Sequence, residues 1–66
     1  SLDYLPWVAE ILVDYATSLI ADDRREDADP LLVEAREIAE QLRWVRLLER
    51  IEGLNRTGLR EEALTP

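Results

Sequence analysis

The sequence predicts an all-α fold, in which an antiparallel αα-hairpin is followed by a third helix. Apolar residues recur at steps of three and four throughout the 66-residue chain, and no segment shows the strict alternation of a strand. Helix-breaking residues are few: only Pro6, Pro30, Gly53, Gly58 and Pro66 interrupt the pattern. The breaks between the apolar runs are short, and short connections place consecutive helices antiparallel.

The first helix is predicted over residues 7–22. Asp3 is suited to cap its start, and Pro6 is tolerated in a first turn, where its missing N–H is not needed. The run ends at the charged segment 22–25, where the periodicity stops. One helix face collects the apolar residues Leu5, Val8, Leu12, Tyr15 and Leu19, with Ile11 and Ala16 beside them. This spacing assigns Tyr15 to the core.

The second helix is predicted over residues 26–42, with Arg36 and Glu40 four apart on its solvated face. Pro30 leaves two starting points open. The helix begins near Glu26 with an irregular first turn, or it begins at Pro30 with Asp29 as its cap. We favour the earlier start. The apolar stripe of this helix consists of Leu31, Leu32, Ala35, Ile38, Ala39 and Leu42.

The third helix is predicted over residues 46–54, with Leu47, Leu48, Ile51 and Leu54 as its apolar face. Two glycines and an asparagine follow between residues 53 and 58, and these residue types tolerate the left-handed conformation that ends helices. Residues 1–54 are therefore expected to form the helical segment. Residues 55–66 are expected to be a linker or tail, with a short helical turn at residues 60–64.

Composition argues against several classes of function. The net charge is −7, and residues 1–41 hold most of the acidic side chains, so direct contact with nucleic acid is not expected. No apolar stretch is long enough to cross a membrane, and no signal peptide opens the chain. We expect a cytoplasmic protein. A chain of this length without cysteine, histidine or an initiator methionine is also expected to be part of a longer protein.

The sequence contains no residue pattern typical of a catalytic site or of a metal site. No histidine is present to activate a serine or threonine, so we expect no enzymatic activity, no catalytic residue and no cofactor. The acidic residues at positions 22–29 invite a calcium site, but Arg24 and Arg25 interrupt them and no glycine provides the sharp turn. A solvated turn between helices explains this cluster better than a metal site.

The spacing of small and large residues resembles a tetratricopeptide repeat. In that family a first set of large and small residues lies on one helix and a second set on the next, with alanines at the helix contact. The sets here are Leu12, Tyr15, Ala16 and Leu19, then Ala28, Leu32 and Ala35, and the apolar face of residues 47–54 follows about one repeat later. Two departures are present: Leu12 stands where Trp is usual, and no Pro follows the second helix. An unrelated helical hairpin or bundle is the alternative.

A narrower resemblance concerns residues 28–42, ADPLLVEAREIAEQL, followed by LERI at residues 48–51. This stretch is similar to the C-terminal repeats of large bacterial regulators that combine an ATPase and repeats with a LuxR-type DNA-binding domain, and of related cyclase-linked signalling proteins. The closing Leu64-Thr65-Pro66 resembles the opening of such a DNA-binding domain. The resemblance implies a protein-interaction or signal-relay module in bacterial transcription regulation. A small dimerisation module and a helical piece of a cyclase-linked enzyme are the alternatives.

The partner is expected to be protein. Trp7 and Trp44 are the strongest candidates for interface anchors, although packing inside the core would also explain them. Three helices enclose one interior, so apolar residues on the two outer edges should need a neighbour, either a second copy or further repeats of the parent protein. The interface candidates are Trp7, Val8, Ile11, Trp44, Leu47, Leu48, Ile51 and Leu54.

Overall fold

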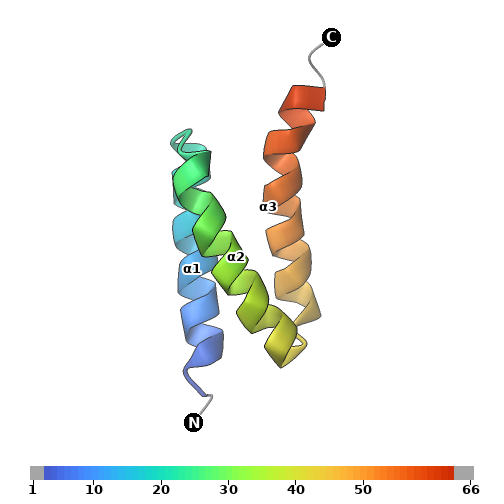
Figure 1. The fold of residues 1–66 in the computed structure, drawn as a ribbon. Coiled ribbons are helices and arrows are strands. Elements are labelled where there is room, and N and C mark those ends of the chain that lie inside the picture. The colour runs from blue at the N-terminus through green and yellow to red at the C-terminus, as the bar shows by residue number, and fades with distance from the viewer. Residues whose placement is uncertain (1–2, 64–66) are drawn as a thin grey trace.

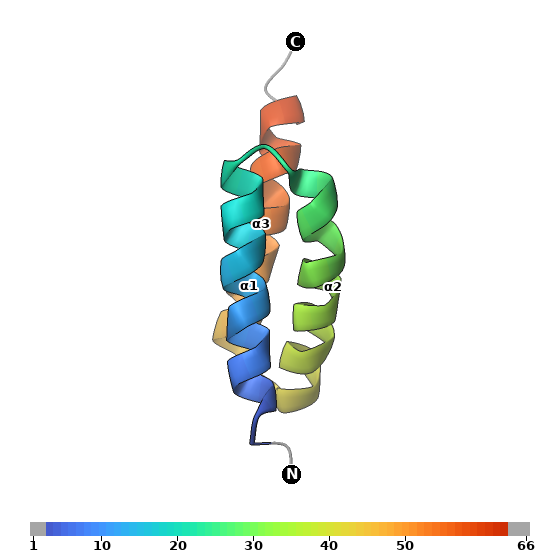
Figure 2. The ribbon, with the colours of Figure 1, turned by 90° about the vertical axis from the view of Figure 1, so that its left-hand side faces the viewer.

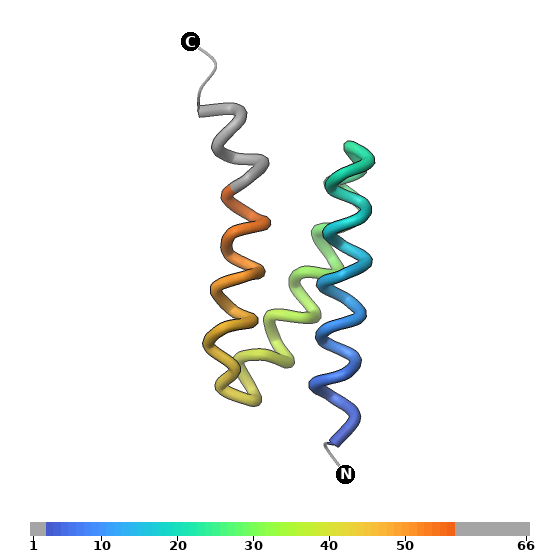
Figure 3. The backbone as a smooth tube through the Cα atoms, turned by 180° about the vertical axis from the view of Figure 1, so that it is seen from behind, coloured from blue at the N-terminus to red at the C-terminus, as the bar shows by residue number. Residues whose placement is uncertain are grey.

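The computed structural model describes the backbone of residues 3–63 and the side chains of residues 3–56. Its elements are α1 (Leu5–Ala21), α2 (Arg25–Leu42) and α3 (Val45–Ala63), and the described residues contain no strand. The predicted helical class is confirmed. α2 runs antiparallel to α1 and crosses it obliquely, and in these views its second half lies between α1 and α3 (Figures 1 and 3). When α1 and α2 are viewed side by side, α3 lies behind them (Figure 2).

The first helix begins two residues before the predicted start. The N-cap position of α1 is occupied by Tyr4 and not by Asp3, which was predicted to cap the helix. The side chain of Tyr4 makes no capping hydrogen bond. Pro6 lies in the first turn, as predicted. A proline there removes no helical hydrogen bond, because the first N–H groups of a helix have no partner within it.

Both tight turns between helices have the same geometry. Asp23 has φ of 63° and Arg43 has φ of 56°, the left-handed conformation. The N–H of Arg24 donates to the carbonyl oxygen of Leu19 at 2.8 Å, and the N–H of Trp44 donates to that of Ala39 at 2.8 Å. This is the Schellman pattern, which satisfies the last carbonyl groups of a helix and reverses the chain. Neither position is glycine, so each turn carries the strain of a side chain in left-handed backbone.

The second helix contains Pro30 in its interior. It starts at Arg25, which settles the choice between the two starting points in favour of the earlier one. Pro30 is the sixth residue and lies in the second turn, where it deletes one hydrogen bond, to the carbonyl of Glu26. The Pro30 side chain is exposed, so its ring occupies solvent and not the contact with α1.

The third helix is longer than predicted. It continues through Gly53 to Ala63, so the boundary at residue 54 and the linker over residues 55–63 are wrong. Gly53 has helical backbone, and a glycine inside a helix costs only about 0.5–1 kcal/mol relative to alanine. The short helical turn expected at residues 60–64 is part of this helix as far as Ala63, and residues 64–66 lie outside the described residues.

The core combines small residues at the hairpin with larger ones from α3. The predicted packing of α1 against α2 is confirmed, and the alanines Ala16, Ala28 and Ala35, predicted at that contact, are fully buried. Tyr15 is 57% exposed, so its assignment to the core is wrong. Its position on α1 lies one residue beyond the buried face, which Ala16 occupies instead. The buried residues are Ala9, Val13, Ala16, Leu19, Ala28, Leu32, Ala35, Ile38, Ala39, Leu47 and Ile51.

Candidate interaction surface

Four large apolar side chains lie exposed in a row along α1. Tyr4 is 59% exposed, Trp7 66%, Ile11 47% and Tyr15 57%. Their spacings of three, four and four residues place them on one face of a helix. We call these four residues the α1 stripe. Trp and Tyr, two of the three residue types enriched at interface hot spots, provide three of its four members.

The α1 stripe faces away from the core. The buried residues of α1 are Ala9, Val13, Ala16 and Leu19, which pack against the other helices. On a helix of 3.6 residues per turn, the stripe positions lie on the opposite side from Ala9 and Val13. The helix is therefore apolar on two faces, although the fold covers only one of them. A helix that is apolar nearly all round is normally covered on every side.

Acidic side chains border one edge of the α1 stripe. Glu10 and Asp14 are exposed, and each immediately precedes a stripe residue. Asp14 accepts a hydrogen bond from Nη2 of Arg50 on α3 at 3.2 Å, an exposed ion pair. Among the described residues Glu10 has no ionic partner, and α1 itself contains no basic residue. The stripe is therefore an apolar surface with a negative border.

The structure divides the eight predicted interface residues into three groups. Trp7 and Ile11 are exposed on the stripe. Val8, Trp44, Leu48 and Leu54 are half-buried and pack against the core. Leu47 is 2% exposed and Ile51 is 1% exposed, so these two are not available to a partner. Their prediction as edge residues was wrong because α3 turns this face onto α2 and closes that part of the core.

The sequence reasoning missed two members of the stripe. Tyr4 is absent from the predicted interface residues, and the helical spacing had placed Tyr15 in the core. A usable signal was present: Tyr4 lies seven residues before Ile11 and Tyr15 lies four after it, so the large side chains form a second periodic row on α1. Two other large apolar residues, Val33 on α2 and Val45 on α3, are exposed at 59% and 62%. These two stand singly on their helices.

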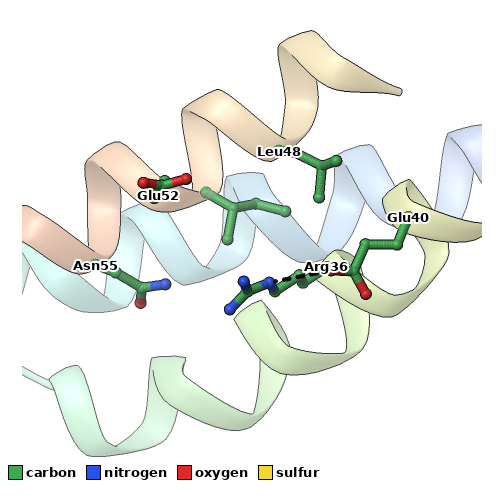
Figure 4. A pocket seen from close by; sticks show the side chains of 6 residues that line it. Arg36, Glu40, Leu48, Glu52 and Asn55 are labelled. Atoms are coloured by element: carbon green, nitrogen blue, oxygen red, sulfur yellow. Dashed lines mark ion pairs between the residues drawn. The ribbon is translucent and has the colours of Figure 1, made fainter. Parts of the chain in front are cut away.

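A small cavity lies between α2 and α3 (Figure 4). Its volume is about 120 Å³, and its lining residues are Arg36, Glu40, Leu48, Ile51, Glu52 and Asn55. Arg36 and Glu40, one turn apart on α2, form an ion pair at 3.5 Å beside the cavity, and both side chains are more than half exposed. Ligand pockets usually measure about 300–1,000 Å³. This cavity is a solvated notch between paired charges, too small for a cofactor-sized ligand.

Other features of the described residues bear on chemistry. No polar or charged side chain among them is buried, and no group of three acidic, histidine or cysteine side chains is arranged to hold a metal ion. No described helix is long and apolar enough to cross a membrane. The α1 stripe is thus the most distinctive surface that the structure presents.

Comparison with known proteins adds no assignment. No protein-family model matches the chain, and neither curated proteins nor solved structures give a match. The function must therefore be argued from the geometry of the α1 stripe and from the residue pattern.

Proposed function

We propose that the chain is a non-catalytic protein-interaction module, a tetratricopeptide-like helical segment that relays signals within a bacterial regulator. The observation that carries the proposal is the α1 stripe: four large apolar side chains in line, each about half exposed or more. Soluble proteins rarely leave a contiguous apolar patch uncovered unless it binds a partner. Single exposed residues such as Val33 require no such explanation.

The repeat-like architecture is supported by the packing of the hairpin. Ala16, Ala28 and Ala35 are fully buried where α1 meets α2, which is the use of small residues in helical repeats. α3 packs on α2 as a following first helix would. Helix pairs of this kind pack further helices on their outer faces, so the apolar outer face of α1 is suited to a helical partner.

The resemblance of residues 28–51 to regulator repeats supports a place in transcription regulation, in the cytoplasm. In this proposal the module contacts protein, and DNA is contacted by another part of the regulator. A dimerisation module is the second candidate, favoured by the same stripe, because a second copy could cover it. The two candidates differ in the partner that covers Trp7 and Ile11: a different protein element for the interaction module, and a second copy of the chain for the dimerisation module.

A selection of helical peptides tests the proposal without assuming a partner. Peptides of random sequence on a helical scaffold are displayed on phage and selected on the folded chain. The recovered peptides should bind at least tenfold more weakly to the Ile11→Ser variant. They should bind undiminished to Val33→Ser, a matched control because Val33 is exposed to a similar extent on another helix. Peptides that bind both variants equally would overturn the proposal.

A further inference from the structure

We infer that the partner of the α1 stripe is an amphipathic α-helix of another protein, with an apolar face bordered by basic side chains. This inference rests on the proposed function and adds the chemistry of the partner. Three observations support it: the shape of the stripe, its acidic border, and the lack of a complementary surface on the chain itself.

The shape of the stripe fits a helix. Tyr4 and Tyr15 are eleven residues apart, which corresponds to about 16 Å along a helix axis. Most backbone groups between them are hydrogen-bonded within α1, so an extended strand would gain few hydrogen bonds from this surface. A helix of similar length can instead pack its side chains into the gaps between the large side chains of the stripe. The exposed Trp7 is placed to insert between two turns of that helix.

The border of the stripe selects the charge of the partner. Glu10 and Asp14 line one edge, and Asp22 and Asp23 follow at the end of α1. One described basic group, Arg50 of α3, meets this edge and is paired with Asp14. Lysine or arginine beside the apolar face of a partner would meet this edge, whereas glutamate there would be repelled. Border charges of this kind select among partners and speed their encounter.

A second copy of the chain does not provide such a face. α2 exposes chiefly acidic residues. α3 exposes Arg46, Arg50 and Arg56, but within its described side chains Val45 is the one exposed large apolar residue. Pairing two α1 stripes antiparallel about a two-fold axis would bring the same edge of each together, so that the edge with Glu10 and Asp14 would meet the equally acidic edge of the other copy. Each copy also carries a net charge of −7.

The experiment uses two synthetic helical peptides of about 14 residues, a length that spans the stripe. Both carry leucine at helical spacing on one face. One has lysine beside the leucines, and the other has glutamate at the same positions. Calorimetric titration into the folded chain should show saturable binding of the lysine peptide. The glutamate peptide should bind at least tenfold more weakly, and added salt should reduce the difference.

Variants of the chain locate the binding. Ile11→Ser and Glu10→Lys should each weaken the lysine peptide, the first by removing apolar contact and the second by reversing the border. Val33→Ser is the control and should leave the affinity unchanged. Circular dichroism confirms that each variant stays helical, which is expected because all three side chains are exposed.

The outcomes separate this inference from the function on which it rests. If the two peptides bind with equal affinity and Ile11→Ser abolishes the binding of both, the basic border of the partner is wrong. The α1 stripe would still be the interaction surface. If the chain forms dimers that Ile11→Ser disrupts, and binds neither peptide, then a second copy covers the stripe and the inference is wrong. Lysine-peptide binding that survives Ile11→Ser would place the contact elsewhere and overturn the inference. A monomer that binds neither peptide would overturn it as well and count against the proposed function.

Discussion

Arg25, in the first turn of α2, donates hydrogen bonds from its guanidinium group to the backbone of Asn55 in α3. The carbonyl oxygen of Asn55 lies 3.0 Å from Nη2, and that of Leu54 lies 3.0 Å from Nη1. The side-chain oxygen of Asn55 accepts from the same Nη2 at 3.4 Å. One side chain thus joins the beginning of α2 to the middle of α3, across thirty residues of sequence.

Replacing Arg25 by alanine should lower the free energy of unfolding by about 1.5 kcal/mol. Hydrogen bonds to charged groups contribute about 1.5–3 kcal/mol, and the partial exposure of Arg25 keeps the value at the lower end. Arg24→Ala is the control, since Arg24 makes only an exposed ion pair with Asp27, and such pairs contribute about 0–1 kcal/mol. Urea denaturation measures both. Equal effects of the two substitutions would contradict the interhelical role of Arg25.

The alanines at the hairpin contact should not accept larger side chains. Ala16→Leu and Ala28→Leu should each destabilise the chain by about 1–3 kcal/mol, because both sites are fully buried and overpacking displaces the helices. Ala21→Leu is the control, at an exposed position near the end of α1. Thermal melting compares the three. If the first two variants melt at the same temperature as the unmodified chain, these alanines do not lie at the contact between α1 and α2. The repeat-like packing would then be wrong as well.

Glycine at the second turn should stabilise the chain. Arg43 has φ of 56°, a conformation that costs a side-chain-bearing residue about 1–2 kcal/mol. Arg43→Gly should therefore raise the free energy of unfolding by about 0.5–1 kcal/mol after the greater flexibility of the unfolded chain is counted. Arg46→Gly removes the same charge inside α3 and should destabilise by up to about 1 kcal/mol. Denaturant melts should show opposite signs for the pair.

Gly53 provides a test of where α3 ends. In the structure a Cβ at Gly53 would meet open space, and the backbone there is helical. Gly53→Ala should therefore raise helicity and stabilise the chain by about 0.5–1 kcal/mol. If α3 instead ended within residues 53–58, as the sequence had indicated, with left-handed backbone at Gly53, the same substitution would destabilise. The sign of the change in a denaturation curve distinguishes the two.

The periodicity of apolar residues was enough to predict the three helices and the contact between α1 and α2. The end of α3 could not be predicted, because Gly53 and Asn55 are residues that commonly end helices, and Arg25, which contacts the backbone of this segment, is far away in sequence. Leu47 and Ile51 were predicted to be exposed for a similar reason. The angle at which α3 returns onto α2 is set by the turn at Arg43, and that geometry is not visible in residue spacing.

The candidate site was predicted in part. Trp7 and Ile11 were recognised as interface residues because large apolar side chains on an outer flank need cover. Tyr15 was misplaced, because its spacing from Leu12 and Leu19 fits the buried face as well as the exposed one. Only the packing of α1 decides between these faces: Ala16 is fully buried, whereas the neighbouring Tyr15 is 57% exposed.

The central claim is that the α1 stripe is a docking surface for a helix, and the most direct measurement is chemical-shift mapping. Nitrogen-15 labelled chain is titrated with the leucine–lysine peptide, and the backbone amide signals and the indole N–H of Trp7 are followed. The account predicts saturable shifts concentrated on residues 4–15, with the indole signal of Trp44 and the amide of Val33 unmoved. Shifts concentrated on α2 or α3, with the Trp7 indole unaffected, would contradict it.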